Sequence, residues 1–279
     1  MTTIQDVPAH ALPSTRYVDE TLARYLADKD DMVGKIDRNP KFSGVLLERF
    51  IEAAVLAELV GKTRDVAVSC LNAALDAGMA AFRLAAGTGP VTVSIAGRDH
   101  VLAATGATDL IHPAAWQRLF GLALALRRKD AADAICAFDV DVMRTSQAGV
   151  DDFRYDVVTA MQQFWCGGNW RAAAERVYET SQPKFTRVAG QDYVDVDVTQ
   201  VKMLEPLDAR DDAAFDAALA ASLEAHKLYW SGKQWSGRII GLIAMTPVGL
   251  AALAHDRGLA TGVRSGYIPD WLVRGELGS

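Results

Sequence analysis

The chain has 279 residues, of which 50% are hydrophobic and 23% charged, and its formal net charge is -6 at pH 7. This composition is that of a globular protein with a sizeable core, and it excludes a disordered chain. The mild acidity also argues against a nucleic-acid binder, which normally shows a basic patch and a high pI. We therefore expect no nucleic acid among the partners, whereas a basic protein partner fits the charge.

Targeting and metal-binding signals are not evident either. The first residues show no basic stretch followed by an apolar one, so no secretory signal is predicted. The longest apolar runs, residues 119–126 and 239–245, are far shorter than the ~20 residues of a membrane-spanning helix. Cys70, Cys136 and Cys166 lie far apart, which disfavours a disulfide framework and a zinc site. We expect a cytoplasmic protein without membrane contact, metal or cofactor.

Residues 1–40 contain three prolines and are expected to be irregular, apart from a short helical stretch around 17–27. Apolar residues with helical spacing then predict a helix over 45–59, with Glu52 largely outside the apolar stripe. A second helix is expected from Thr63, as its cap, to Gly87.

The clearest strand signal is the alternating run 91–95, followed by the turn 96–99 and a short return strand at 100–102. We expect a β-hairpin here, inserted between helices. Pro113 then begins a third helix, which ends at the basic residues 127–129.

Two helical hairpins are predicted from Pro113 onward, and the helix that begins at Pro113 is the first arm of the first hairpin. Asp130 can cap the next helix, which reaches residue 142. The next hairpin consists of a helix that Asp151 or Asp152 starts and that runs to Trp165, a Gly167-Gly168 turn, and a helix over 170–180 that Asn169 caps.

The segment 189–217 is acidic. It carries eight carboxylates against Lys202 and Arg210, so its charge of -6 equals that of the whole chain. Residues 193–198 alternate, which predicts valines on one face and carboxylates on the other. We interpret the segment either as a solvated loop or as a surface that docks a basic cleft of a partner. The aspartates assigned to that surface are Asp192, Asp195, Asp197, Asp208, Asp211 and Asp212.

The C-terminal part is again helical. A long helix is expected over 212–230, and another from about Trp235, which Thr246-Pro247 either kinks or restarts. Gly258 is a natural stop, and the aromatic tail 267–273 should pack back on the helices. The predicted fold is mainly α, built of stacked helical hairpins with one small inserted β-hairpin. We expect an N-terminal irregular segment at 1–40 and a single helical domain at 41–279.

Motifs that would carry catalysis are weak in this sequence. No phosphate-binding loop is present, and the Asp195-Val-Asp197-Val-Thr199 run resembles a phosphatase nucleophile motif without the surrounding α/β pattern. Cys166 has no identifiable base, and His226 is expected to be a hydrogen-bonded core histidine. We expect no catalytic residues and no enzyme activity.

Three C-terminal segments carry a family resemblance: residues 226–230, 241–258 and 265–273. Together with the 116–130 hairpin they resemble the immunity protein 49 family of bacterial polymorphic toxin systems, over roughly residues 90–275. The chain also resembles a second immunity family, which neutralises certain PoNe-type DNases and has a comparable aromatic helix and Tyr-x-Pro tail. The positions that match the family's structural motif are Trp230, Asp256, Gly258, Tyr267 and Pro269.

The resemblance implies a protein that binds a cognate toxin, delivered by contact-dependent or type VI secretion, and blocks it. A toxin active in the cytoplasm, such as a nuclease with a basic cleft, is the expected partner, and a homodimer is left open. Two alternatives are a helical-hairpin adaptor that binds a peptide or protein in a groove, and a small-molecule enzyme with a site near residues 165–170 or His226.

Overall fold

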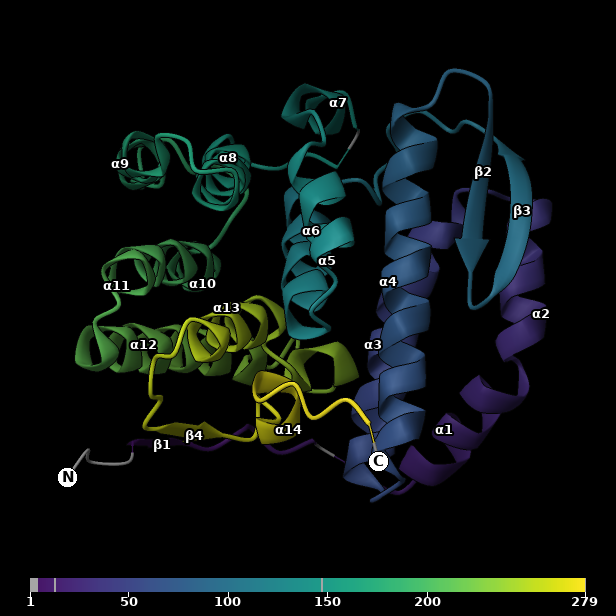
Figure 1. The fold of residues 1–279 in the computed structure, drawn as a ribbon, viewed down its shortest axis with the longest axis horizontal. Coiled ribbons are helices and arrows are strands. Elements are labelled where there is room, and N and C mark those ends of the chain that lie inside the picture. The colour runs from purple at the N-terminus through teal and green to yellow at the C-terminus, as the bar shows by residue number, and fades with distance from the viewer. Residues whose placement is uncertain (1–4, 13, 147, 279) are drawn as a thin grey trace. The chain divides into compact units, whose positions relative to one another are not determined.

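The structure is a computed structural model that describes residues 5–12, 14–146 and 148–278. The fold is mainly helical, as the sequence predicts, and the described sheets have two strands each (Figure 1). Internal contacts divide the chain into two compact units. The first unit consists of Pro13–Leu119, Phe138–Ala148 and Leu277–Ser279, and the second of Met1–Leu12, Phe120–Ala137 and Gly149–Glu276.

The first unit is built around a pair of long helices. Its elements are α1 (Val18–Ala27), α2 (Lys29–Gly34), a 3-10 helix (Lys35–Asp37), α3 (Phe42–Leu59), α4 (Arg64–Ala86), β2 (Pro90–Ile95), β3 (Arg98–Ala103), the start of α5 (Pro113–Ala125) and α7 (Val140–Arg144). Helices α3 and α4 pack along each other, and Gly61 makes the turn between them with a positive φ of 64°. Both helices have the bounds that the apolar spacing predicts to within three residues.

Glu52 of α3 departs from the predicted pattern, because it is buried rather than outside the apolar stripe. Its carboxylate accepts hydrogen bonds from the hydroxyl of Tyr25 at 3.2 Å and from Arg49 at 3.3 Å. Helix α1 covers this side of α3 and supplies the tyrosine. A covering helix of this kind leaves no signal in the local sequence of α3.

The β2–β3 hairpin lies where the alternating sequence predicts it, with Pro90 opposite Ala103. Ala96 and Gly97 form its two-residue turn, and both have positive φ angles, of 52° and 78°. Such a turn suits the right-handed twist of a hairpin. The backbone N–H of Ala96 donates to a carboxylate oxygen of Asp76 at 3.1 Å, which ties the turn to α4.

The second unit contains the remaining helices and a parallel strand pair. Its elements are β1 (Gln5–Val7), the end of α5, α6 (Lys129–Cys136), α8 (Phe153–Trp165), α9 (Trp170–Thr180), α10 (Gln191–Lys202), α11 (Leu204–Ala209), α12 (Asp212–Ser231), a 3-10 helix (Ile239–Leu242), α13 (Met245–Asp256), β4 (Val263–Ser265) and α14 (Asp270–Val273). The predicted α8–α9 hairpin is confirmed, and the side chain of Asn169 caps α9 by accepting from the N–H of Ala172 at 3.3 Å.

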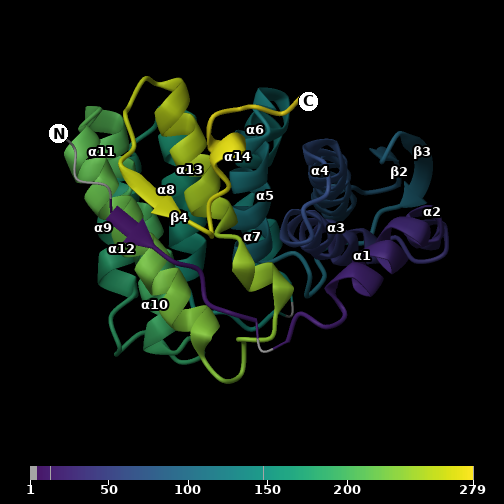
Figure 2. The ribbon, with the colours of Figure 1, turned by 90° about the horizontal axis from the view of Figure 1, so that it is seen from below.

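Strands β1 and β4 pair in parallel, with Gln5 opposite Val263 and Val7 opposite Ser265. They run side by side in both ribbon views (Figures 1 and 2). Three-residue strands are too short to leave a recognisable pattern, so the sequence did not predict this pairing.

Two expectations about the chain's course are corrected. No helix begins at Trp235: a turn and the 3-10 helix follow α12, and α13 restarts at Met245. Residues 18–37 are largely helical, although the stretch 1–40 was expected to be mostly irregular; residues 1–4 and 13 of it lie outside the described ranges. The boundary between the two units does not fall at residue 40, and a single domain over 41–279 stays a prediction.

Two helical segments, Arg64–Ala86 and Ile239–Asp256, are long and apolar enough to span a membrane by length and composition. Their most apolar windows are 61% and 78% buried inside the protein. This burial is what core helices of a soluble protein show, and such helices pass the same test.

Candidate functional site

The prediction that residues 193–198 place valines on one face and carboxylates on the other is wrong, because these residues form part of helix α10. On a helix, residues two apart point to different sides, so Asp195 and Asp197 do not share a face. Asp195 is partly exposed and accepts a hydrogen bond from the Gln191 amide at 2.8 Å, whereas Asp197 is 1% exposed. The alternation of valine and aspartate therefore does not produce a single acidic edge.

Asp197 forms a buried ion pair with Arg154 of α8, with Nε of the arginine 3.1 Å from the carboxylate. The guanidinium also donates to the hydroxyl of Tyr193 and lies 4.4 Å from the centre of that ring. Burial alone would lower the pKa of Arg154, but Tyr193 and Asp197 outweigh it and the pKa lies above its usual value. Asp197 is thus a structural residue that no partner can reach in this conformation.

The other predicted aspartates stand at exposed positions of α10, α11 and the start of α12. Asp208 pairs with Arg171 of α9 at 2.8 Å, and the same arginine contacts Glu205 at 3.3 Å. Asp211 caps α12 by accepting from the N–H of Ala214 at 3.0 Å. These carboxylates therefore support local structure as well as contributing negative charge.

Asp212 and Asp216 connect α12 to the segment that precedes β4. Asp212 accepts from the N–H of Ala260 at 3.2 Å, and Asp216 accepts from the N–H of Gly262 at 2.8 Å. Burial, together with the neighbouring Asp212, raises the pKa of Asp216 despite the bond from Gly262. Of the predicted set, Asp192, Asp195, Asp208, Asp211 and Asp212 remain accessible to a partner to some degree.

A cavity of about 540 Å³ opens beside Asp192, and we call it the Arg154 cavity. Its lining comes from the start of α8, the loop before α10, the first turn of α10, and the end of α12 with the turn after it. The residues are Val150, Asp151, Arg154, Val188, Ala189, Gly190, Asp192, Tyr193, Tyr229, Gly232, Lys233, Gln234 and Trp235. Tyr229 and Trp235 stack with their ring centres 5.7 Å apart, and Tyr193 meets Tyr229 edge to face at 5.0 Å.

Asp151 fixes the loop that forms one wall of this cavity. Its carboxylate accepts hydrogen bonds from the backbone N–H groups of Arg187 at 2.8 Å, Val188 at 3.1 Å and Ala189 at 2.7 Å. Burial would raise the pKa of Asp151, but these donors outweigh it and hold the pKa below its usual value. The sequence predicted Asp151 only as a helix start, and no local signal marks its partners 36 to 38 residues away.

Trp230 and Tyr267 of the family-like motif lie in one aromatic cluster in the second unit. His226 contacts the ring of Trp230 at 6.0 Å and that of Tyr267 at 4.8 Å between centroids. The hydroxyl of Tyr267, which is fully buried, accepts from the backbone N–H of His10 at 2.9 Å. A Cβ atom on Gly241 would lie 2.5 Å from the Trp230 ring, so this position must be glycine.

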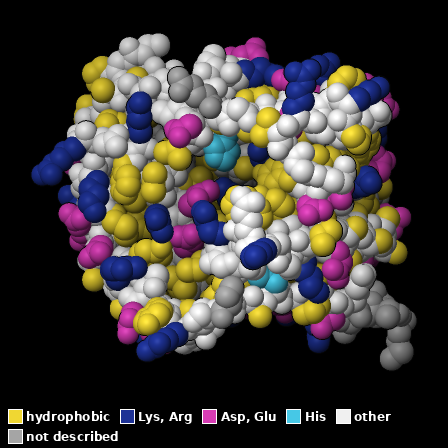
Figure 3. Space-filling view, turned by 180° about the vertical axis from the view of Figure 1, so that it is seen from behind, with side chains coloured by type: hydrophobic (Ala, Val, Ile, Leu, Met, Phe, Trp, Pro, Cys, Tyr) yellow, Lys and Arg dark blue, Asp and Glu magenta, His cyan; other side chains and the backbone are white. Residues whose placement is uncertain are grey.

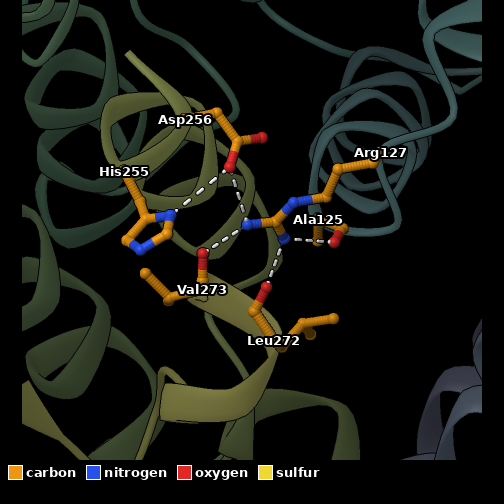
Figure 4. Close-up of polar contacts among 6 residues, drawn as sticks. All are labelled: Ala125, Arg127, His255, Asp256, Leu272 and Val273. Carbon is orange, nitrogen blue, oxygen red and sulfur yellow. Dashed lines mark hydrogen bonds and ion pairs between the residues drawn. The ribbon is translucent and has the colours of Figure 1, made fainter. Parts of the chain in front are cut away.

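Asp256, Gly258 and Pro269 belong to the C-terminal framework. Gly258 has a φ of 85° and ends α13, and Pro269 precedes α14. Asp256 pairs with Arg127 at 3.2 Å. Arg127 also donates to the backbone carbonyls of Ala125, Leu272 and Val273, so one guanidinium joins the end of α5 to α13 and α14 (Figure 4). The sequence identified Arg127 only as a helix-ending cation.

The residues considered for catalysis are not brought together. His226 is buried and its Nε2 lies 2.8 Å from the carbonyl oxygen of Gly241, which confirms a hydrogen-bonded core histidine. Cys166 is exposed, and His255 contacts only its neighbour Asp256, at 3.4 Å, among its described ion pairs. No group of three or more His, Cys, Asp or Glu suited to a metal occurs within 5–12, 14–146 and 148–278.

Charges of both signs are interspersed on the molecular face seen in Figure 3. On that face, Lys and Arg side chains alternate with Asp and Glu side chains, with apolar side chains between them.

The comparisons with known proteins give one result. A model of the family described as immunity protein 49 matches residues 49–272, which is well over half of the chain. Searches of curated proteins and of solved structures give no match. The matched range contains the aromatic contact of His226 with Trp230 and the ion pair of Arg127 with Asp256. The chain belongs to the immunity protein 49 family.

Proposed function

We propose that this chain binds a cognate bacterial toxin and blocks its action, so that the producing cell and its siblings are protected. The observation that carries the proposal is membership of the immunity protein 49 family over residues 49–272. Toxin neutralisation needs only a folded surface that is complementary to the toxin, and the catalytic candidates of the sequence lie apart in this fold.

We further propose that the toxin's active site is covered by the acidic surface on α10, α11 and the start of α12. Its aspartates are Asp192, Asp195, Asp208, Asp211 and Asp212; Asp197 is removed from the set because it is buried. Negative potential on this surface would speed association with a basic cleft, such as that of a nuclease.

The first experiment is co-expression of the chain with the toxin-like gene next to its own. Restored growth and co-purification of the two chains are expected. If the chain neither neutralises nor binds any linked gene product, the proposal fails, and a helical adaptor that binds a peptide or protein becomes the better interpretation.

The acidic surface has its own test. Replacing the five accessible aspartates by asparagine removes their charge but keeps acceptor oxygens at the cap of α12 and opposite Ala260. We expect a slower association rate and a weaker salt dependence of that rate. A matched control replaces five exposed aspartates of the first unit: Asp19, Asp28, Asp30, Asp31 and Asp65. Equal association rates for the two variants would remove the acidic surface from the interface.

A further inference from the structure

Arg154 is a buried cation in the wall of a cavity. It is 8% exposed, yet it lines the Arg154 cavity of about 540 Å³. A guanidinium carries five N–H donors, and buried donors are normally satisfied. Nε donates to Asp197 and Nη2 donates to Tyr193. Among the described residues, Nη1 donates to no acceptor and is not fully buried, so water or a group entering the cavity can accept its hydrogen bonds.

Lys233 provides a second positive charge on the cavity wall, and Gln234 beside it provides an amide donor. Both residues are exposed and lie in the turn that follows α12. Carboxylates and phosphates both accept charge-assisted hydrogen bonds from guanidinium and ammonium groups, and the side chains of an unmodified protein partner offer carboxylates.

The carboxylates of the cavity are already engaged or lie at its opening. Asp151 accepts three backbone N–H groups, and Asp197 is paired with Arg154. Asp192 is exposed and lies in the first turn of α10, where the helix dipole offsets negative charge. Lys233, in contrast, forms no ion pair among the described residues, so its ammonium group can pair with an incoming carboxylate.

The aromatic walls define the rest of the ligand. Tyr229 and Trp235 stack on each other, and Tyr193 packs against Tyr229, so apolar ring surface flanks the cationic groups. Such surface suits the methylene groups of an acidic side chain, and excluding water there strengthens the ion pair.

We infer that the Arg154 cavity receives an aspartate or glutamate side chain of the toxin, with its carboxylate held by Arg154 and Lys233. The inference rests on the proposed function. It adds an anchor to the acidic surface: Asp192 stands at the same opening and would face basic residues that surround the inserted carboxylate on the toxin.

Recognition of the carboxylate can be tested without the toxin. The probe is N-acetyl-glutamate methylamide, titrated into the full chain while the Nε–H signal of Arg154 and the indole signal of Trp235 are followed by NMR. The matched probes are the glutamine and lysine analogues. We expect the glutamate probe alone to shift these signals. The shifts should be lost in Lys233→Glu and Arg154→Lys, but kept in Lys202→Glu, a control at an exposed position of α10. Shifts with the lysine probe, or none at ~100 mM of any probe, overturn the inference.

The toxin complex supplies the second test. Loss of one charge-assisted contact should weaken binding roughly tenfold or more in Lys233→Glu. A toxin variant with one acidic residue changed to lysine should then restore binding to Lys233→Glu. If the Lys233→Glu and Arg154→Lys variants bind the toxin with affinities within about twofold of that of the unmodified chain, the inferred carboxylate contact is wrong, and the proposed function is unaffected. Failure of the unmodified chain to bind would instead overturn the proposed function.

Discussion

Gly121 of α5 and Gly249 of α13 meet backbone to backbone in the second unit. A Cβ atom on Gly249 would lie 2.6 Å from the Cα atom of Gly121, and one on Gly121 would lie 2.8 Å from the Cα atom of Thr246. Only hydrogen atoms fit in this crossing, so the two helices approach more closely than any larger pair of side chains permits.

Because of this contact, we expect a Gly→Ala replacement to change the free energy of unfolding in the direction opposite to the usual one. Within a helix, Gly→Ala usually stabilises a protein, by about 0.5–1 kcal/mol. Gly249→Ala should instead lower the free energy of unfolding by about 1–3 kcal/mol, because backbone atoms cannot move aside. Urea unfolding of the variant and of the unmodified chain measures this difference. Gly34→Ala in α2 is the control, since a Cβ atom there meets nothing within 4 Å; equal effects at both positions would contradict the close crossing.

The buried pair of Arg154 and Asp197 makes a second prediction. Asp197→Ala should destabilise the chain by about 3–5 kcal/mol, because it leaves a buried cation without its partner. Asp192→Ala, at an exposed position of the same helix, should change stability by about 0.5 kcal/mol or less. Thermal unfolding of both variants measures the difference. A mild effect of Asp197→Ala would contradict the structural role of the ion pair.

Asp151 gives the stability a defined dependence on pH. Its pKa is lower in the folded chain than in the unfolded one, so its contribution is complete above the unfolded value of about 3.9. That contribution is lost as the pH falls through the folded value. Asp151→Asn should therefore cost about 1–3 kcal/mol at pH 7 and less near pH 3, as measured by urea unfolding.

Asp216 has the opposite shift and serves as the contrast. Burial raises the pKa of Asp216 in the folded state. The stability that the protonated group contributes is therefore lost as the pH rises from the unfolded pKa through the folded pKa. Asp216→Asn should thus cost less at pH 7 than Asp151→Asn does. A larger cost for Asp216→Asn would contradict the assignment of the two shifts.

Arg127 should control the order of the C-terminal segment. Arg127→Ala removes donors to the carbonyls of Leu272 and Val273, so hydrogen exchange of the backbone at 270–276 should become faster. Because φ is 56° at this position for either residue type, the comparison isolates the guanidinium from backbone strain. Arg128→Ala is the control, since that side chain pairs with its neighbour Asp130 on the surface. Unchanged exchange in Arg127→Ala would rule out the tether.

Local signals made much of the fold predictable. Apolar spacing gave α3, α4 and α12, and turn residues gave the β2–β3 hairpin and the end of α13 at Gly258. These features depend on residues within one or two turns of each other, so the sequence contains the information directly.

The interpretation of the candidate site depended on contacts that the sequence does not display. Alternating valine and aspartate at 193–198 imitates a half-buried strand, but Arg154, 43 positions earlier, offers Asp197 a buried partner on a helix. Arg127 is likewise defined by carbonyl groups 145 and 146 residues away. Such partners are fixed by tertiary packing, which overrides local preference.

The pairing of β1 with β4 has a consequence for biosynthesis. Residues 5–7 are synthesised well before their partners at 263–265, with most of the described chain between the two strands. The second unit therefore cannot close until residue 265 has been made, whereas most residues of the first unit, up to 119, are available to fold earlier. Until then, β1 and its neighbours lack their partner strand, and an incompletely packed unit of this kind is prone to aggregation.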